Sequence, residues 1–239
     1  MLGHSGATGY NSDPDQSGTD ALSNSWASGT NPDVASIYSR LLAADPGMEG
    51  QVSNAAVDGS RVDDLDGQLS RALQEQPAPS LVIIQTVDND VRCDGTDDQF
   101  YAEFQATLTE VLHHVVDASP QAKIVVVGTW ATVANYTSVV AAQPGGKQGL
   151  LTGSGPCDPF DKAGKRHPER MRYQQEVFDH YQAGLQAACA SVPACHEDGG
   201  ALNRMVITGK DLASDYSHLS ISGLRKQAAT EWSLIKTLV

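Results

Sequence analysis

The sequence predicts an α/β protein in which helices cover both faces of a parallel, doubly wound sheet, with residues 1–239 forming a single domain. Two continuously apolar, β-branched runs, 80–87 and 122–130, are typical of parallel strands that are buried on both faces. Segments with apolar residues at helical spacing alternate with these strands, and helices of that length require right-handed crossovers between parallel strands. A length of 239 residues is common for one α/β domain.

The first strand and helix are predicted between residues 51 and 73. Residues 51–57 (QVSNAAV) are a short apolar stretch that predicts a strand. Ser60 is expected to cap the helix that follows, whose apolar residues recur at helical spacing. These residues are Val62, Leu65, Leu69, Ala72 and Leu73. The strand over 80–87 comes next.

A long helix is predicted between Thr96 and Pro120. Thr96 and Gln99 stand at capping-box spacing, and the helix is expected to end before Pro120. The apolar residues on one of its faces predict a core contact rather than a cofactor site. They are Phe100, Phe104, Leu108, Val111, Leu112 and Val115.

The C-terminal half continues the alternation. After the strand over 122–130, residues 131–167 are rich in glycine and proline and predict a long loop, either a specificity-setting wall or an inert surface excursion. A helix is predicted from about Pro168 to Ala190. The last helix is expected to begin near Ser222 and to bury one apolar face, consisting of Leu224, Ala228, Trp232 and Ile235.

The charge balance limits the classes of partner. A net charge of −13 excludes nucleic acid as the main partner and disfavours anionic lipid, because proteins that bind phosphate backbones need basic stripes. No apolar run reaches the roughly 18 residues that span a bilayer, so no transmembrane segment is predicted.

The four cysteines favour two disulfides. None of them forms a CxxC pair, which makes a zinc ribbon or a thioredoxin-like site unfavourable. The preferred pairs are Cys189–Cys195, around a turn at Pro193, and Cys93–Cys157, across long loops. Four buried, reduced thiols in a cytosolic protein remain the alternative, because four cysteines allow three pairings.

Five residues in four separated stretches form a chemically consistent set. Ser5 lies in GHSGATG, Gly59 in NAAVDGS, Asn89 in DND, and Asp215 and His218 in DYSHLS. A serine becomes a nucleophile when an imidazole accepts its proton and a carboxylate orients that imidazole, which assigns His218 and Asp215. A developing oxyanion needs N–H donors, and Gly59 and Asn89 suit that role.

Each stretch also has an ordinary structural explanation. A serine among glycines is commonly a solvated loop, DND a turn or helix cap, and an isolated DxxH has no function. Their conjunction at predicted strand ends favours chemistry, because active sites of such sheets lie at the carboxyl ends of strands. An α/β-hydrolase elbow is excluded, since position 7 is alanine and no strands precede Ser5. A calcium loop is excluded by Arg92 at a ligand position.

In this order, the four stretches resemble the SGNH or GDSL family of serine hydrolases over essentially the whole chain, and most of all its secreted actinobacterial members. The resemblance implies a three-layer, flavodoxin-like α/β/α fold and ester hydrolysis without a metal or other cofactor. It implies Ser5 as nucleophile, His218 as base and Asp215 as its orienting partner. The oxyanion donors would be the N–H groups of Ser5 and Gly59 and the Asn89 amide.

Three features depart from the family pattern. His4 stands in place of the aspartate of the GDS signature, so the nucleophile turn is expected to be supported differently. Val87 replaces the glycine of the GxND block, which would shift Asn89 or narrow the pocket. Only four residues precede Ser5, where the family has a central strand. We therefore expect part of the first strand, and any signal peptide, to be missing, and the protein to be secreted.

The predicted function is hydrolysis of carboxylic esters through an acyl-enzyme on Ser5. Short-chain or carbohydrate acyl esters are the expected substrates, and a lipase acting on longer chains is an alternative. A second alternative is a binding protein that kept the fold but lost catalysis through the changes at His4 or Val87 or through the missing strand. The substrate itself, the acyl length and the oligomeric state are not predicted.

Overall fold

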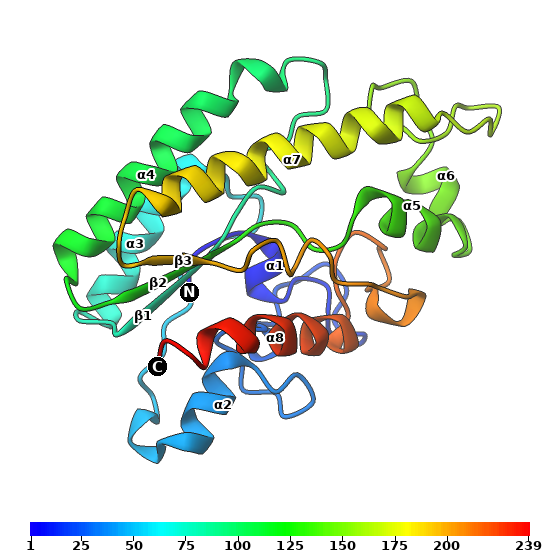
Figure 1. Ribbon diagram of the computed structural model, residues 1–239. Coiled ribbons are helices and arrows are strands. Elements are labelled where there is room, and N and C mark those ends of the chain that lie inside the picture. The colour runs from blue at the N-terminus through cyan, green and yellow to red at the C-terminus, as the bar shows by residue number, and fades with distance from the viewer.

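The structure, a computed structural model, describes all residues from Met1 to Val239 and contains a parallel sheet between two layers of helices (Figure 1). The sheet has the order β1-β2-β3, with β1 at Leu81–Gln85, β2 at Lys123–Val127 and β3 at Cys195–Glu197. Both strand pairs are parallel, and Ile84 is in register with Val126. The helices are α1 (Ser5–Thr8), α2 (Ile37–Ala44), α3 (Leu65–Glu75), α4 (Tyr101–Ala118), α5 (Val133–Ala141), α6 (Gly146–Leu150), α7 (Pro168–Ala190) and α8 (Ile221–Ile235).

Five short 3₁₀ turns complete the secondary structure. Two of them lead directly into long helices, and one precedes the loop that carries Asp215 and His218. They are η1 (Leu22–Asn24), η2 (Pro46–Met48), η3 (Val62–Asp64), η4 (Asp97–Gln99) and η5 (Gly209–Asp211).

The N-terminal residues extend the sheet beyond β1. Leu2 forms a parallel bridge with Ile84, and its N–H donates to Ile83 O over 2.9 Å. On the other side of residues 1–3, Ala55 N–H donates to Met1 O and Val57 N–H donates to Gly3 O. Residues 53–57 therefore lie alongside residues 1–3, in the place of a further strand.

The prediction of a strand over 51–57 is nevertheless wrong, because this segment has no regular ladder. The Gln68 side chain on α3 takes both backbone groups of Gly3, accepting from its N–H at 2.7 Å and donating to its carbonyl at 2.9 Å. Gly3 N–H is thus unavailable to Ala55 O, which accepts from Arg71 Nη2 instead. A side chain interrupts the pairing that the apolar pattern favours.

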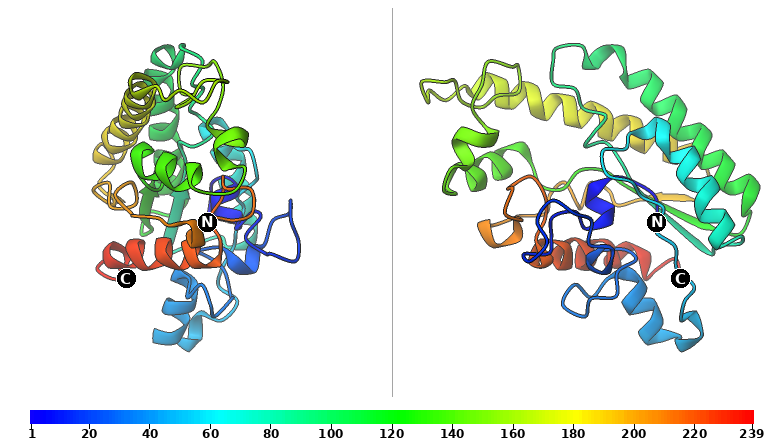
Figure 2. Two further views of the ribbon diagram at one scale, coloured as in Figure 1. Left: turned by 90° about the vertical axis from the view of Figure 1, so that its right-hand side faces the viewer. Right: turned by 180° about the vertical axis from the view of Figure 1, so that it is seen from behind.

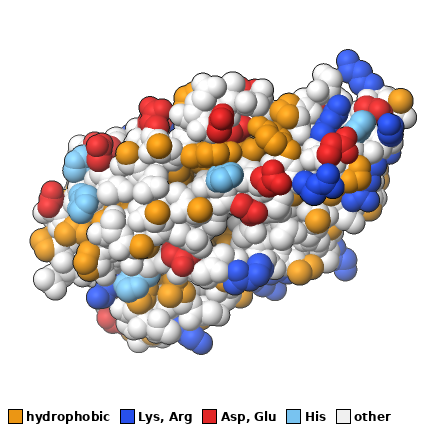
Figure 3. Space-filling view, turned by 45° about the horizontal axis from the view of Figure 1, so that its top comes forward, with side chains coloured by type: hydrophobic (Ala, Val, Ile, Leu, Met, Phe, Trp, Pro, Cys, Tyr) orange, Lys and Arg blue, Asp and Glu red, His pale blue; other side chains and the backbone are white.

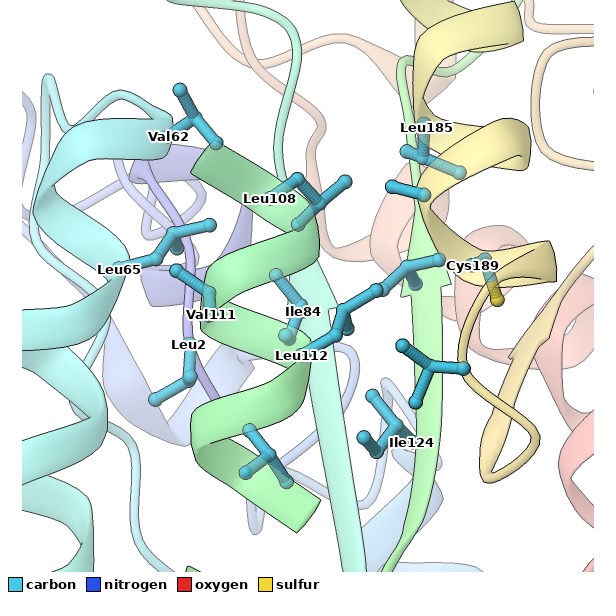
Figure 4. Close-up of a cluster of buried hydrophobic side chains, with 14 of the residues drawn as sticks. Leu2, Val62, Leu65, Ile84, Leu108, Val111, Leu112, Ile124, Leu185 and Cys189 are labelled. Carbon is cyan, nitrogen blue, oxygen red and sulfur yellow. The ribbon is translucent and has the colours of Figure 1, made fainter. Parts of the chain in front are cut away.

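The first face of the sheet packs against α3, α4 and α7. Val82 and Ile84 of β1 and Ile124 and Val126 of β2 belong to this cluster of buried side chains. Figure 4 shows Ile84 and Ile124 beside α4 residues, with Leu185 and Cys189 of α7 next to them. The predicted stripe on α4 is confirmed as core at five of its six positions, Phe104, Leu108, Val111, Leu112 and Val115.

The second face packs against α8 and α2. Ile83, Val125 and Val127, which alternate with the residues above, form a second cluster with Trp26 and Ile37. Figures 1 and 2 show α2 and α8 on the side of the sheet opposite to α3, α4 and α7. Burial of successive side chains on opposite faces explains why both strands are continuously apolar. The predicted three-layer α/β/α fold is confirmed.

The predicted long helix over 168–190 is α7, and the strands over 80–87 and 122–130 contain β1 and β2. The prediction of an unbroken loop over 131–167 is wrong, since it contains α5 and α6. The expected capping roles of Ser60 and Thr96 are also wrong. Arg61 precedes η3, and the side chain of Thr96 makes no capping hydrogen bond to η4.

Both preferred disulfides are present. Cys93 is bonded to Cys157, and Cys189 to Cys195, so no thiol is free. The second bond closes the turn between α7 and β3. None of the helices is both long enough and apolar enough to cross a bilayer.

Candidate active site

The predicted nucleophile lies on a tight turn at the sheet edge. Gly3 takes a φ of +144°, which suits glycine, and a Cβ there would lie 2.4 Å from Gln85 O. Ser5 then begins the four-residue helix α1 and is 7% exposed. The chain passes close to the end of β1 and presents Ser5 just beyond it.

Ser5, His218 and Asp215 form one chain of hydrogen bonds. Ser5 Oγ lies 2.9 Å from His218 Nε2, and His218 Nδ1 lies 2.7 Å from Asp215 Oδ2. Because a carboxylate only accepts, the imidazole proton is on Nδ1 and Nε2 accepts from the serine hydroxyl. This order of groups allows the serine proton to move to the imidazole while the carboxylate fixes the tautomer.

Asp215 also organises the loop that holds His218. Its Oδ1 accepts from the N–H groups of Ser217 and His218 at 2.9 and 3.0 Å, and Ala213 N–H donates to His218 O. Burial acts to raise the pKa of the Asp215 carboxyl, but hydrogen bonds from His218 and Asn11 outweigh it and hold this pKa well below its usual range. Asp215 is therefore an ionised acceptor.

Two residues close behind Ser5 in the sequence support this chain, and the sequence analysis missed both. Asn11, at a φ of +57°, places its side-chain amide near Asp215, where it helps to lower the pKa of that carboxyl. The Tyr10 ring lies 4.8 Å from the imidazole of His218, centroid to centroid. The sequence signal for Asn11 is its tolerance of left-handed backbone, but no motif links it to a carboxylate two hundred residues away.

His4 connects the nucleophile turn to the loop that carries Asn89. It is 3% exposed, and its Nδ1 accepts from Gly6 N–H at 3.1 Å, which places the ring proton on Nε2. His4 Nε2 lies 3.3 Å from Asp88 Oδ2, although not in good hydrogen-bond alignment. Burial lowers the pKa of His4 in spite of the neighbouring carboxylates Asp88 and Asp90. A neutral histidine thus supports the turn where an aspartate was expected.

The structure brings Asn89 to the site but leaves Gly59 at its margin. Asn89 lines the same cavity as Ser5 and His218, and its Nδ2 donates to Ser60 O at 3.0 Å. Gly59 is exposed, takes a φ of +75° and is not among the residues that line this cavity. The Asn89–Ser60 hydrogen bond nevertheless ties the two loops together. The N–H groups of Ser5 and Gly59 donate to no acceptor in the protein.

The loop before Asn89 keeps a glycine-like conformation without a glycine. Val87 is fully buried at a φ of +96°, a region that strongly disfavours β-branched residues. Asp90 holds this turn, since its Oδ2 accepts from Val87 N–H and Thr86 Oγ1 and its Oδ1 from Val62 N–H. Val87 is not part of the cavity lining, so the cavity is not narrowed by it.

The cavity beside Ser5 has a volume of about 320 Å³ and walls from five separate segments, within residues 4–10, 88–89, 129–136, 174–178 and 217–224. Trp130 and Tyr136 meet edge to face at 5.7 Å between ring centroids, and α7 contributes Gln174 and Phe178. Burial raises the pKa of Tyr136 to about 12, so this phenol stays neutral. No three His, Cys, Asp or Glu side chains are arranged as metal ligands.

A comparison with known proteins agrees with this architecture. A family model described as GDSL-like Lipase/Acylhydrolase family matches residues 1–223. No curated protein matches the chain significantly.

Two solved structures match the chain at low sequence identity. An extracellular lipase from Streptomyces rimosus is 14% identical to this chain, and the alignment covers 97% of this chain and 97% of the lipase chain, with a TM-score of 0.49. Another solved structure is 18% identical, and the alignment covers 99% of this chain and 94% of that structure's chain, with a TM-score of 0.49. Since the family model spans nearly the whole sequence, the chain belongs to the GDSL-like lipase/acylhydrolase family.

Proposed function

We propose that the protein is a serine esterase that cleaves carboxylic esters through an acyl-enzyme on Ser5. The observation that carries this proposal is the hydrogen-bond chain from Ser5 Oγ through His218 to Asp215, at 2.9 and 2.7 Å. It joins residues 213 positions apart and opens into a cavity.

In the acylation step, Ser5 Oγ bonds to the ester carbonyl carbon while its proton passes to His218 Nε2. Asp215 stabilises the imidazolium that forms. The tetrahedral intermediate collapses, the bond to the alcohol oxygen breaks, and His218 returns the proton to the leaving alcohol. Water, activated by His218 in the same way, then releases the acid and restores the serine.

The negative charge on the carbonyl oxygen needs donors near Ser5. The Ser5 N–H donates to no acceptor in the protein. Asn89 lines the same cavity, and because Ser60 O uses only one of its two amide N–H groups, the other can donate to the oxyanion. We assign the third donor to Gly59 N–H, on the loop that Asn89 holds.

The cavity favours a small acyl or sugar group. Its volume of about 320 Å³ is near the lower end of ligand pockets, which span roughly 300–1,000 Å³. Trp130, Tyr136 and Phe178 offer flat apolar walls. We therefore propose short-chain or carbohydrate esters as substrates, acting outside the cytoplasm, where the two disulfides persist.

The decisive experiment combines covalent labelling with turnover. The wild-type protein should react with a fluorophosphonate probe and hydrolyse p-nitrophenyl acetate faster than longer esters, whereas Ser5→Ala should do neither. Ser12→Ala is the matched control, because Ser12 is also buried but donates only to Gly9 O. Equal labelling of wild type and Ser5→Ala would refute the assignment. A protein that is folded and binds acetylated sugars but shows no turnover would support a binding module instead.

A further inference from the structure

The positive charge of this acidic chain is concentrated at one end. Residues 147–172 contain six of its sixteen Lys and Arg residues but only three of its twenty-nine carboxylates, a net charge of +3 in a chain whose total is −13. We call these six cations the basic end. They are Lys147, Lys162, Lys165, Arg166, Arg170 and Arg172. Figure 3 shows blue side chains gathered at the end of the molecule formed by α6 and the loop before α7.

None of the six cations is paired with a carboxylate. Ion pairs of Lys and Arg occur elsewhere, at Arg225–Asp33 and Lys226–Asp211. The carboxylates of the basic end are engaged differently. Asp161 and Glu169 both contact His167, at 3.2 and 2.8 Å, and Asp158 accepts from Gly155 N–H. The positive charge is therefore left for an external partner.

Four of the six cations are exposed, and the surface they occupy is held in place. Lys162, Lys165, Arg166 and Arg172 are exposed. The Cys93–Cys157 disulfide fixes the loop beneath them. The two half-buried cations brace it, as Lys147 lies over the Phe160 ring at 4.2 Å and Arg170 Nη1 donates to the carbonyls of Gly153 and Asp158.

The basic end adjoins the mouth of the active-site cavity. Arg170 lies one helical turn before Gln174, which lines that cavity, and α5, which supplies Val133 and Tyr136, packs against α6 and α7. Figure 1 shows α6 and this loop projecting beyond the ends of the strands that carry the site.

We propose that the basic end docks the protein on an anionic lipid surface, with the active-site cavity beside the contact. Three observations favour a surface over a single polyanionic chain. The end projects rather than forming a groove, and none of its cations lines the active-site cavity. Leu150, an exposed apolar side chain suited to an interfacial anchor, lies at the C-terminal end of α6, three residues after Lys147. The remaining surface is acidic and would be repelled, which fixes the orientation.

Vesicle flotation tests this proposal independently of catalysis. All variants carry Ser5→Ala, so that lipid stays intact whether or not the proposed esterase activity exists. Vesicles of phosphatidylcholine alone are compared with vesicles that contain about 30% phosphatidylglycerol. The test variant is Lys162→Glu/Lys165→Glu, whose side chains make no hydrogen bonds. The matched control is Lys123→Glu/Lys236→Glu, which changes the net charge equally at exposed sites outside the basic end.

We expect the parent protein to float only with the anionic vesicles, and to be released by about 0.5 M salt. The test variant should partition at least about tenfold less, since each cation near such a surface contributes on the order of 1 kcal/mol. The control should lose less than about threefold, because charges more than a Debye length from the surface are screened. Leu150→Ser should weaken flotation with the vesicles but leave binding to soluble dextran sulfate unchanged.

Three results would overturn the proposal. The parent protein fails to float with anionic vesicles, or the test and control variants lose binding equally, which would reflect net charge alone. The third is retention by dextran sulfate without flotation, which would identify a soluble polyanion as the partner. Lys162→Gln/Lys165→Gln provides the same test if the glutamate variant is poorly folded.

Discussion

Ser5, His218 and Asp215 are joined side chain to side chain, whereas Asn89 and Gly59 approach the same serine only through loops. In the first region, two hydrogen bonds of 2.9 and 2.7 Å fix every proton position. In the second, Asn89 is held through Ser60 O and through Asp90, and Gly59 is exposed. The proposed proton-transfer groups are thus fixed by direct contacts, and the proposed oxyanion donors by backbone conformation. Substitutions in the two regions should therefore lower activity by different amounts and through different causes.

After Ser5, the largest effect is expected at Asp215. Asp215→Asn should lower kcat by about 10⁴-fold, since an amide that accepts through Oδ1 from the loop N–H groups cannot also accept from His218 Nδ1. Esterase kinetics measure this loss. A reduction below about tenfold would show that the carboxylate only shapes the loop.

The same variant also tests how the stability of the folded protein depends on pH. The pKa of Asp215 lies below its ordinary value near 3.8, so the carboxylate stabilises the folded state above that pH, and this contribution is lost as the pH falls further. Thermal melts should therefore place wild type above Asp215→Asn at pH 6, and the gap should close toward pH 2. A gap that widens with acid would contradict the sign.

At Asn89 we expect a smaller loss of a different kind. Asn89→Ala should lower kcat by about 10²- to 10³-fold with little change in KM, because the amide acts on the developing oxyanion. Asn203→Ala is the matched control, since Asn203 Nδ2 also donates to a loop carbonyl, that of Ala131, at 3.2 Å. Equal losses in both variants would mean that Asn89 serves only to hold its loop.

His4 and Asp88 join the two regions and should act as a unit. His4→Asn keeps an acceptor for Gly6 N–H but cannot reach Asp88, and Asp88→Ala removes the other partner. Each should lower kcat about tenfold, and the double variant should be no worse than either single one. Additive losses in this double-mutant cycle would show that the two residues act separately.

Gly59 should give the smallest effect. A Cβ at Gly59 meets no atom within 4 Å, so Gly59→Ala should cost about 1 kcal/mol of stability through its φ of +75° and lower kcat by no more than about threefold. Gly50→Ala is the control, with a φ of +73° and an equally open surrounding. A loss above about a hundredfold at Gly59 alone would show that the added Cβ displaces the Gly59 N–H from the oxyanion.

The same contrast explains which elements of the fold could be predicted from the sequence. The buried strands were predictable from their continuously apolar, β-branched runs, and α7 from apolar residues at helical spacing. β3 was not, since Cys-His-Glu lacks an apolar run, and α5 and α6 lie in a stretch whose glycines and prolines favour a loop. The strand expected over 51–57 failed because Gln68 competes for the backbone of Gly3.

At the site, motif order predicted which groups meet but not which residues support them. Ser5, His218 and Asp215 meet as predicted, since the motif specifies which groups must touch. Contacts of His4 with Asp88 and of Asn11 with Asp215 depend on where loops turn, which no local pattern encodes. The conformation of Val87 could not be predicted either, because Asp90 and tertiary packing impose a positive φ that a valine disfavours.

The Cys93–Cys157 bond links the loop that begins at Asn89 to the loop that bears Lys162 and Lys165. One covalent crosslink therefore connects the proposed docking end to the loop that follows the proposed oxyanion donor Asn89. In a reducing solution this covalent link would be lost, and only non-covalent packing would hold the two loops together.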